Sequence, residues 1–238
     1  MSNILAIETS TPMCSVAVRC GGQLEVASTL AHQSHSEMVL EMVEHVLGRA
    51  RLTLAECDAI AFGAGPGSFT GLRIACSVAQ GLAFGSDCPV IAVNTLAALA
   101  EQACGPADAT AAPGPRVLCA LDARMGEVYW SLLQRTKGTW LEHIAPTLSR
   151  PSEIAAELIR PVEYGCGSAF ALFAPDLEPL VQTVLLPRYP EAGAVAKLGQ
   201  DLYAAGRFMP PALAQPLYVR DRVALTTAER AAQAELER

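Results

Sequence analysis

The chain has 238 residues, of which 51% are hydrophobic, and a formal net charge of −7. This length allows one large domain or two small lobes, and the scattered lysines and arginines exclude a basic surface for direct nucleic-acid binding. The eight cysteines form no Cys-x-x-Cys motif and lie mostly in apolar runs, which is typical of a reducing cytosol. With no basic flank at the start and no apolar run of about 20 residues, we expect no signal peptide, no membrane contact and a cytoplasmic location.

The first part of the chain predicts a lobe with the element order β-β-β-α-β-α-β-α. Alternating apolar residues and tight turns indicate a meander of three strands, and apolar residues at helical spacing then indicate helices between further strands. The expected strands are 4–7, 14–18, 23–28, 59–62 and 89–93, and the expected helices are 36–48, 70–84 and 95–103.

Residues 105–115 contain three prolines and no periodicity, and they are the best candidate for a linker. The chain then repeats its opening, with strands at 117–121, 127–133 and 139–144, so that Asp122 takes the place of Glu8. We therefore expect a duplicated α/β fold of two lobes, at 1–104 and 116–238, the second smaller. In that second lobe we expect a helix opening at Pro151, a strand at 162–164, a turn at 165–167, a helix at 192–205 and a tail helix from Thr226.

A glycine-rich segment, Gly63 to Arg73, lies between a predicted strand and a predicted helix. Glycines there permit positive φ and close approach, and Ser68 or Thr70 can cap the helix, so the segment could cradle a phosphate. It lacks the lysine of a P-loop and the spacing of Gly-x-Gly-x-x-Gly. The alternative is a tight turn that packs the helix closely against the sheet.

Two carboxylates facing each other across a cleft would suit a magnesium nucleotide, and glycine turns could hold its phosphates. The candidates for this cleft are Glu8, Asp122, Gly165 and Gly167, with ATP or ADP as the ligand. However, Arg124 projects where such a site needs a glycine. The alternative is that both acids end their strands and accept hydrogen bonds from turns.

Other chemistry has weaker support in the sequence. His32, His35 and Glu37 have a ligand-like spacing but precede a helix without a third histidine, which favours a capping segment. Ser68 has no Gly-x-Ser-x-Gly context and no histidine base. We therefore expect no metal site, no catalytic residue and no peptidase activity.

The first two helices have wide apolar or small-residue faces. Such faces pack against a sheet, and they also let another protein approach closely. The sequence leaves both interpretations open, and the candidate interface residues are Met38, Val39, Met42, Val43, Val46, Leu72, Ala75, Cys76 and Ala79.

Four motifs in this order resemble the TsaB (YeaZ) family of bacterial tRNA threonylcarbamoyladenosine synthesis, over nearly the whole chain. They are Ile4-Leu-Ala-Ile-Glu-Thr-Ser10, Gly65-Pro-Gly-Ser-Phe-Thr-Gly-Leu-Arg73, Asp122-Ala-Arg-Met-Gly-Glu-Val-Tyr129 and Pro216-Leu-Tyr-Val-Arg220. The resemblance implies the two-lobed fold of actin, Hsp70 and the sugar kinases. The metal site of the catalytic paralogue TsaD resembles the motif Asn-His-x-Glu-Gly-His just after the fifth strand. At the corresponding positions this chain has Thr95 and Leu99 in place of the two histidines, which implies that the metal ligands are absent.

The resemblance therefore implies a non-catalytic scaffold that pairs with a TsaD-like paralogue through the helices of the first lobe. A TsaE-like ATPase would join near that interface, and the complex would modify adenosine 37 of tRNAs that read codons beginning with adenine. Alone, the same surface would form a homodimer, and tRNA would be met only through the complex. The alternative is a nucleotide-dependent phosphotransferase that uses the cleft between the lobes.

Overall fold

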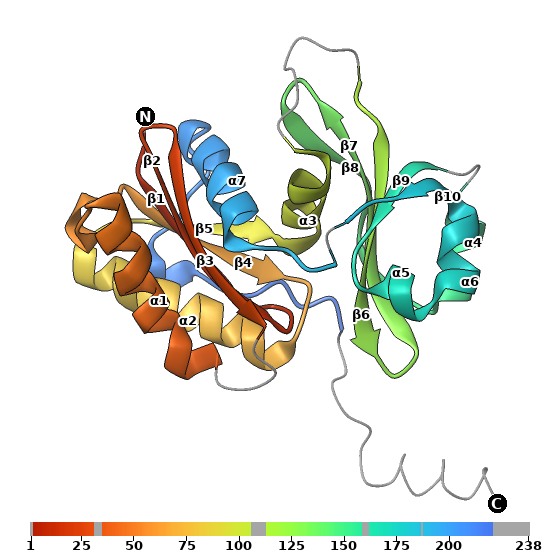
Figure 1. Ribbon diagram of the computed structural model, residues 1–238, viewed down its shortest axis with the longest axis horizontal. Helices are drawn as coiled ribbons and strands as arrows, with labels where there is room; N and C mark the ends of the chain where they lie inside the picture. Colours follow the sequence, from red (N-terminus) through yellow and green to blue (C-terminus); the bar gives the residue numbers. More distant parts are fainter. Residues whose placement is uncertain (1, 31–34, 106–112, 159–161, 187, 221–238) are drawn as a thin grey trace, which may run out of the picture.

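The computed structural model describes residues 2–30, 35–105, 113–158, 162–186 and 188–220. Figure 1 shows two lobes, each built on one sheet. The first lobe contains β1 (Ile4–Glu8), β2 (Met13–Cys20), β3 (Gln23–Leu30), α1 (His35–Ala50), η1 (Leu54–Glu56), β4 (Ala59–Gly65), α2 (Phe69–Ser86), β5 (Val90–Asn94) and α3 (Thr95–Cys104).

The second lobe follows the expected linker, of which residues 106–112 lie outside the described part. It contains β6 (Arg116–Arg124), β7 (Glu127–Thr136), β8 (Thr139–Ser149), η2 (Pro151–Glu153), α4 (Ile154–Glu157), β9 (Val162–Cys166), α5 (Ala169–Leu172), α6 (Ala174–Leu177), η3 (Glu178–Leu180) and β10 (Val181–Val184). The chain ends its described course with α7 (Ala192–Ala204) and η4 (Pro211–Leu213).

The two sheets have the same topology, which confirms the predicted duplication. Their strand orders are β3-β2-β1-β4-β5 and β8-β7-β6-β9-β10, with an antiparallel meander on one side and parallel strands on the other. The second lobe is reduced because short helices take the places of the long α1 and α2. Glu8 and Asp122 occupy equivalent places at the carboxyl ends of β1 and β6.

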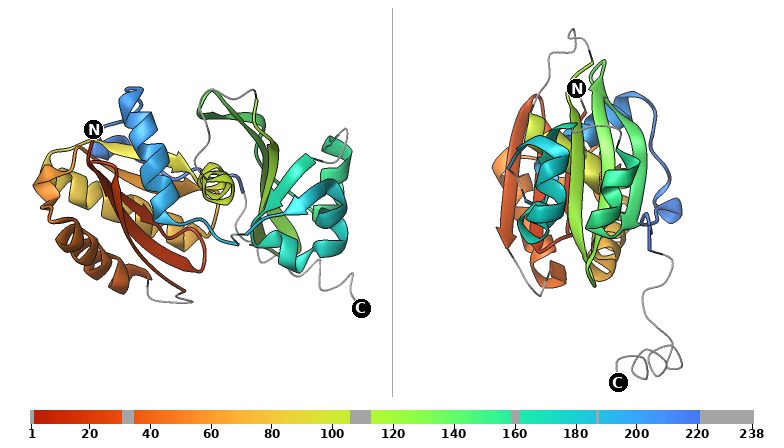
Figure 2. Two further views of the ribbon diagram at one scale, coloured as in Figure 1. Left: turned by 45° about the horizontal axis from the view of Figure 1, so that its top comes forward. Right: turned by 90° about the vertical axis from the view of Figure 1, so that its right-hand side faces the viewer.

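The last helix of each repeat does not stay within its own lobe. Helices α1 and α2 cover one face of the first sheet, and α7 packs Ala192, Val195 and Ala196 on the other face of that sheet. Helix α3 in turn contributes Leu96 and Leu99 to a core shared with β6, β7 and β9. The expected lobe 116–238 is therefore wrong at its end, because α7 returns to the first lobe (Figures 1 and 2).

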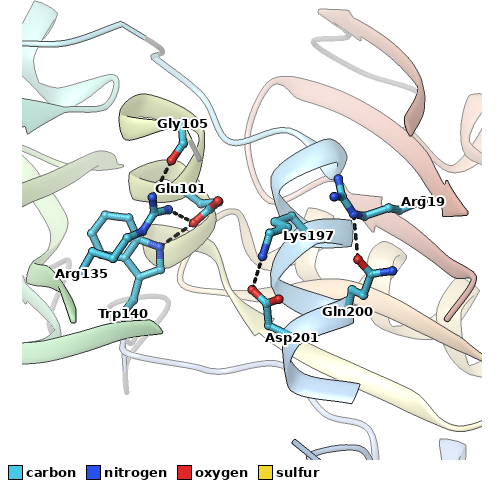
Figure 3. A network of polar contacts seen from close by, with 8 residues as sticks. All are labelled: Arg19, Glu101, Gly105, Arg135, Trp140, Lys197, Gln200 and Asp201. Carbon is cyan, nitrogen blue, oxygen red and sulfur yellow. Dashed lines mark hydrogen bonds and ion pairs between the residues drawn. The ribbon is translucent and has the colours of Figure 1, made fainter. Parts of the chain in front are cut away.

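Polar contacts reinforce this exchange around α3, as Figure 3 shows. Arg135 of β7 forms a buried ion pair with Glu101 of α3 and donates to the carbonyl of Gly105 at 2.5 Å. The indole Nε1 of Trp140 on β8 donates to the same carboxylate at 2.9 Å, and the Arg135 guanidinium lies 4.6 Å from the Trp140 ring centre. Helix α3 therefore joins the lobes through both an apolar core and a buried charge pair.

Some expected boundaries need correction. Strand β9 continues to Cys166, so the predicted turn at 165–167 begins only at Gly167, and the parallel partner strand β10 was not expected. The helix expected to open at Pro151 is a 3-10 turn followed by four helical residues. The tail helix expected from Thr226 lies outside the described residues. None of the helices described could cross a membrane, being too short or too polar.

Candidate functional site

The glycine segment turns β4 into α2, and its glycines make room for the β1–β2 turn. A side chain at Gly71 would collide with the carbonyl of Thr9, and one at Gly67 would lie 2.6 Å from the carbonyl oxygen of Ser10. The N–H of Ser68 donates to that Ser10 carbonyl at 2.7 Å, while the Ser68 hydroxyl caps α2 at the Gly71 N–H. The turn therefore uses these N–H groups for packing, which favours the tight-turn interpretation over a phosphate cradle.

Glu8 is completely buried below this turn, and Gly63 carries no side chain because the carboxyl lies against it. Its Oε1 accepts the Ser10 N–H at 2.7 Å, and its Oε2 has no hydrogen-bond partner among the described residues. Burial raises the pKa of the Glu8 carboxyl to about 7, and nearby groups of Ser10, Thr9 and Thr95 offset only part of that rise. A carboxyl in this position cannot reach a ligand in the cleft without rearrangement.

Asp122 differs from Glu8 because it borders the cleft. Its carboxylate accepts the Arg124 N–H at 2.9 Å and pairs with the Arg124 guanidinium at 3.3 Å. The structure therefore does not bring the two acids together as a pair of metal-binding carboxylates.

The other two cleft candidates serve packing. Gly165 makes room for the ring of Phe170. Gly167 has φ of +116° and lies against the Ala120 carbonyl, where a side chain would collide.

A cavity of about 650 Å³ lies between the lobes. The first lobe lines it with the start of α2 and the β1–β2 turn, and the second lobe with the β6–β7 hairpin. Its charged lining residues are Asp122, Arg124, Arg188 and Arg220, of which Asp122 pairs with Arg124. This lining has more cations than anions and lacks the carboxylate pair expected for a magnesium nucleotide.

The fold brings no further metal ligands to His35 among the described residues. His35 begins α1, and His32 lies outside the described residues. Within the described ranges no three His, Cys, Asp or Glu side chains gather as metal ligands. Six of the eight cysteines are buried, and burial raises the pKa of the Cys57 thiol to about 12, so they behave as apolar core residues.

Helices α1 and α2 turn most of the candidate interface residues inward. Residues in the first-lobe core cannot be contact residues on the surface, so this part of the prediction is wrong. Their apolar faces cover the chain's own sheet, which was the alternative left open by the sequence. The buried candidates are Val39, Val43, Val46, Leu72, Ala75, Cys76 and Ala79, whereas Met38 and Met42 are partly exposed.

The sides of the two helices that face away from the sheet carry exposed residues, and these residues are here called the outer face. It comprises Leu40, Glu41 and Glu44 of α1 and Arg73, Ser77, Gly81 and Phe84 of α2. Leu40 is 50% exposed and Phe84 64% exposed, and a side chain at Gly81 would meet nothing within 4 Å. The outer face thus combines large apolar side chains, a small-residue strip on α2 and acidic residues on α1.

Comparison with known proteins assigns the family. The family model described as "TsaD: tRNA N6-adenosine threonylcarbamoyltransferase" matches residues 18–164. The tRNA threonylcarbamoyladenosine biosynthesis protein TsaB of Escherichia coli is 36% identical over 93% of this chain and 96% of its own length. The chain belongs to the TsaB family. The TsaB of Haemophilus influenzae is 34% identical over 92% of this chain and 94% of its own length.

Solved structures agree with the TsaB assignment. YeaZ from Pseudomonas aeruginosa superposes with a TM-score of 0.80, at 34% identity, over 92% of this chain and 100% of its own. A second structure, described as an uncharacterized Pseudomonas aeruginosa protein with similarity to peptidase YeaZ, gives 0.81 at 33% identity with the same coverage. The two-lobed actin-like fold implied by the resemblance is thereby confirmed.

In this TsaB-family chain, residues 94–99, which by the resemblance correspond to the metal site of the TsaD paralogue, hold α3 in place. Asn94 caps α3 by accepting the N–H groups of Leu96 and Ala97 at 2.9 and 3.3 Å. Thr95 accepts the Gly65 N–H at 3.0 Å, and Leu99 is fully buried between the lobes. These positions therefore anchor α3.

The interface candidates predicted from the sequence do not include the exposed residues of the outer face. Their signal was present: Ser77, Gly81 and Gly85 recur every four residues, in the helical phase opposite to the buried Ala75, Ala79 and Ala83. A helix phase that pairs exposed small residues with exposed Phe84 is not explained by packing on the chain's own sheet.

Proposed function

We propose that this chain is a non-catalytic scaffold subunit of tRNA threonylcarbamoyladenosine biosynthesis. The observation that carries the proposal is its similarity to TsaB proteins over more than nine-tenths of both chains. In this role the chain pairs with a TsaD-like catalytic paralogue, and a TsaE-like ATPase joins the pair, in the cytoplasm. The complex then transfers the threonylcarbamoyl group to adenosine 37, and this chain meets tRNA only through it.

The outer face of α1 and α2 is our candidate for the docking surface. Ser77 and Gly81 allow a partner helix to approach the α2 backbone closely, because they present almost no side chain. Phe84 offers an apolar anchor that is largely in contact with water in the isolated chain. The acidic residues Glu41 and Glu44 of α1 favour a partner with basic residues at the matching positions.

We infer that the homodimer expected of the isolated chain would use the same surface. A self-complementary contact that buries Phe84 would compete directly with the paralogue for this face. Adding the paralogue should therefore convert the homodimer into a heterodimer.

The test is copurification of the chain with its TsaD-like paralogue. Gly81→Glu adds a charged side chain to the outer face, and the open space there leaves the fold intact. The matched control, Ala156→Glu, places the same carboxylate on the exposed surface of α4 in the second lobe. We expect Gly81→Glu to abolish the complex and Ala156→Glu to preserve it; a complex that survives Gly81→Glu contradicts the docking surface.

A further inference from the structure

The segment Pro216–Arg220, here called the strap, contacts both lobes after the chain has returned to the first. The N–H of Leu217 donates to the carbonyl of Ala64 in β4 at 2.7 Å. Gly65 permits this approach, because a side chain there would lie 2.7 Å from the carbonyl oxygen of Leu217. One end of the strap is therefore fastened to the glycine turn that begins α2.

Tyr218 ties the strap to the exposed side of α2. Its ring lies 5.7 Å from that of Phe69, and its hydroxyl accepts a hydrogen bond from Arg73 Nε at 3.1 Å. The Arg73 guanidinium also lies over the Phe69 ring at 3.8 Å. Because Arg73 belongs to the outer face, a protein docked there would contact the same cluster that holds the strap.

The other end of the strap is fastened to the second lobe by Arg220. Its guanidinium forms an ion pair with Glu127 at 2.8 Å and donates to the Ala123 carbonyl at 2.9 Å. It also donates to Met125 Sδ at 3.4 Å. These partners form the tip of the β6–β7 hairpin, and the Arg220 side chain is only 15% exposed. The strap is thus a polar bridge from α2 to this hairpin.

The strap and α3 connect the lobes in different ways. Helix α3 joins them through the fully buried Leu96 and Leu99, whereas Leu217, Tyr218 and Arg220 line the cavity between the lobes. An apolar core such as that of α3 separates only at a large free-energy cost, while a few partly exposed polar contacts break and form readily. If the lobes move relative to each other, we therefore expect the contacts of α3 to persist and those of the strap to break and form.

We propose that the strap couples the outer face of α2 to the position of the β6–β7 hairpin. A partner that engages Arg73 would then stabilise the tie at Arg220, and the state of the hairpin would in turn alter binding at α2, since such coupling is reciprocal. This inference rests on the proposed docking surface. In this inference, a partner bound at α2 brings the two lobes closer together across the cavity.

Hydrogen exchange of the full chain, read by mass spectrometry, tests the tie first. Arg220→Gln removes the charge at the hairpin, and Arg207→Gln makes the same change at an exposed first-lobe position. We expect Arg220→Gln to speed exchange of hairpin amides 123–128 roughly tenfold, with α1 unchanged and the control like wild type. Unchanged hairpin exchange, or an equal rise throughout the chain, overturns the proposal.

Adding the TsaD-like paralogue then tests the coupling. We expect slower exchange in both α2 and the hairpin of the wild type, and in α2 alone for Arg220→Gln. If α2 is protected in both proteins and the hairpin responds identically in both, the strap does not couple them, although the docking surface stands. If α2 is not protected in the wild type, the docking surface fails, and the coupling fails with it.

Discussion

The buried Glu8 carboxyl makes a quantitative prediction about stability and pH. Its pKa rises from 4.5 in the exposed state to about 7 in the folded chain because burial disfavours the charged form. The folded protein therefore binds more protons than the unfolded chain between these values, and stability falls as pH rises through this window. A difference of about 2.5 pKa units corresponds to roughly 3 kcal/mol of lost unfolding free energy above about pH 7.

Replacing Glu8 with Gln removes this penalty. In the wild type the Ser10 N–H donates to Glu8 Oε1 at 2.7 Å, and the amide oxygen of Gln can accept the same hydrogen bond. The amide NH₂ can donate to the Ser10 hydroxyl, which has no hydrogen-bond partner among the described residues. We expect the variant and the wild type to be similarly stable near pH 4.5. Near pH 8 the variant should be more stable by up to about 3 kcal/mol.

Urea unfolding followed by far-ultraviolet circular dichroism, at several pH values between about 4.5 and 8, measures this difference. Subtracting wild type from variant cancels the titration of the other groups. The control is Glu56→Gln, since hydrogen bonds from Thr53 lower the pKa of that exposed carboxyl and its difference should run in the opposite direction. A Glu8→Gln difference that is constant with pH refutes the burial argument.

Further expected outcomes concern packing, the lobe junction and the cleft. Gly71→Ala should destabilise the chain by about 3 kcal/mol, because its Cβ meets the Thr9 carbonyl, whereas Gly81→Ala in open space should stabilise α2 by about 1 kcal/mol; thermal denaturation compares them. Glu101→Gln should cost roughly 3 to 5 kcal/mol by urea unfolding, because it leaves Arg135 buried without its anion, and a cost below about 1 kcal/mol would show that the pair is dispensable. Titration calorimetry of the isolated chain with Mg-ATP should give no binding heat, and micromolar binding weakened by Asp122→Asn would restore the phosphotransferase alternative.

The duplicated topology could be predicted from the sequence because each repeat begins with the same local pattern. An apolar strand ends in a carboxylate, a tight turn follows, and the second strand reverses, so Glu8 and Asp122 indicated the register of the duplication. The strand β10 and the short helices of the second lobe have too few residues to establish a periodicity.

The destination of α7 could not be predicted in the same way. Its alanine-rich face suits either sheet, and only the tertiary contacts show that it packs on the first lobe, where the Ala192 N–H donates to the Ser15 hydroxyl. For the same reason the helical period of α1 and α2 identified an apolar face without showing what covers it. Val39 and Val43 pack against the first-lobe sheet, and the surface that a partner could contact lies on the opposite side of the helices.

The central claim, that the outer face of α2 joins this chain to a TsaD-like paralogue, is tested most directly by the mass of the mixture. Sedimentation analysis of equimolar wild-type chain and paralogue should give a single heterodimeric species, and Gly81→Glu should leave the two proteins separate while retaining the wild-type circular dichroism spectrum. A heterodimer formed equally well by the Gly81→Glu chain would contradict the claim.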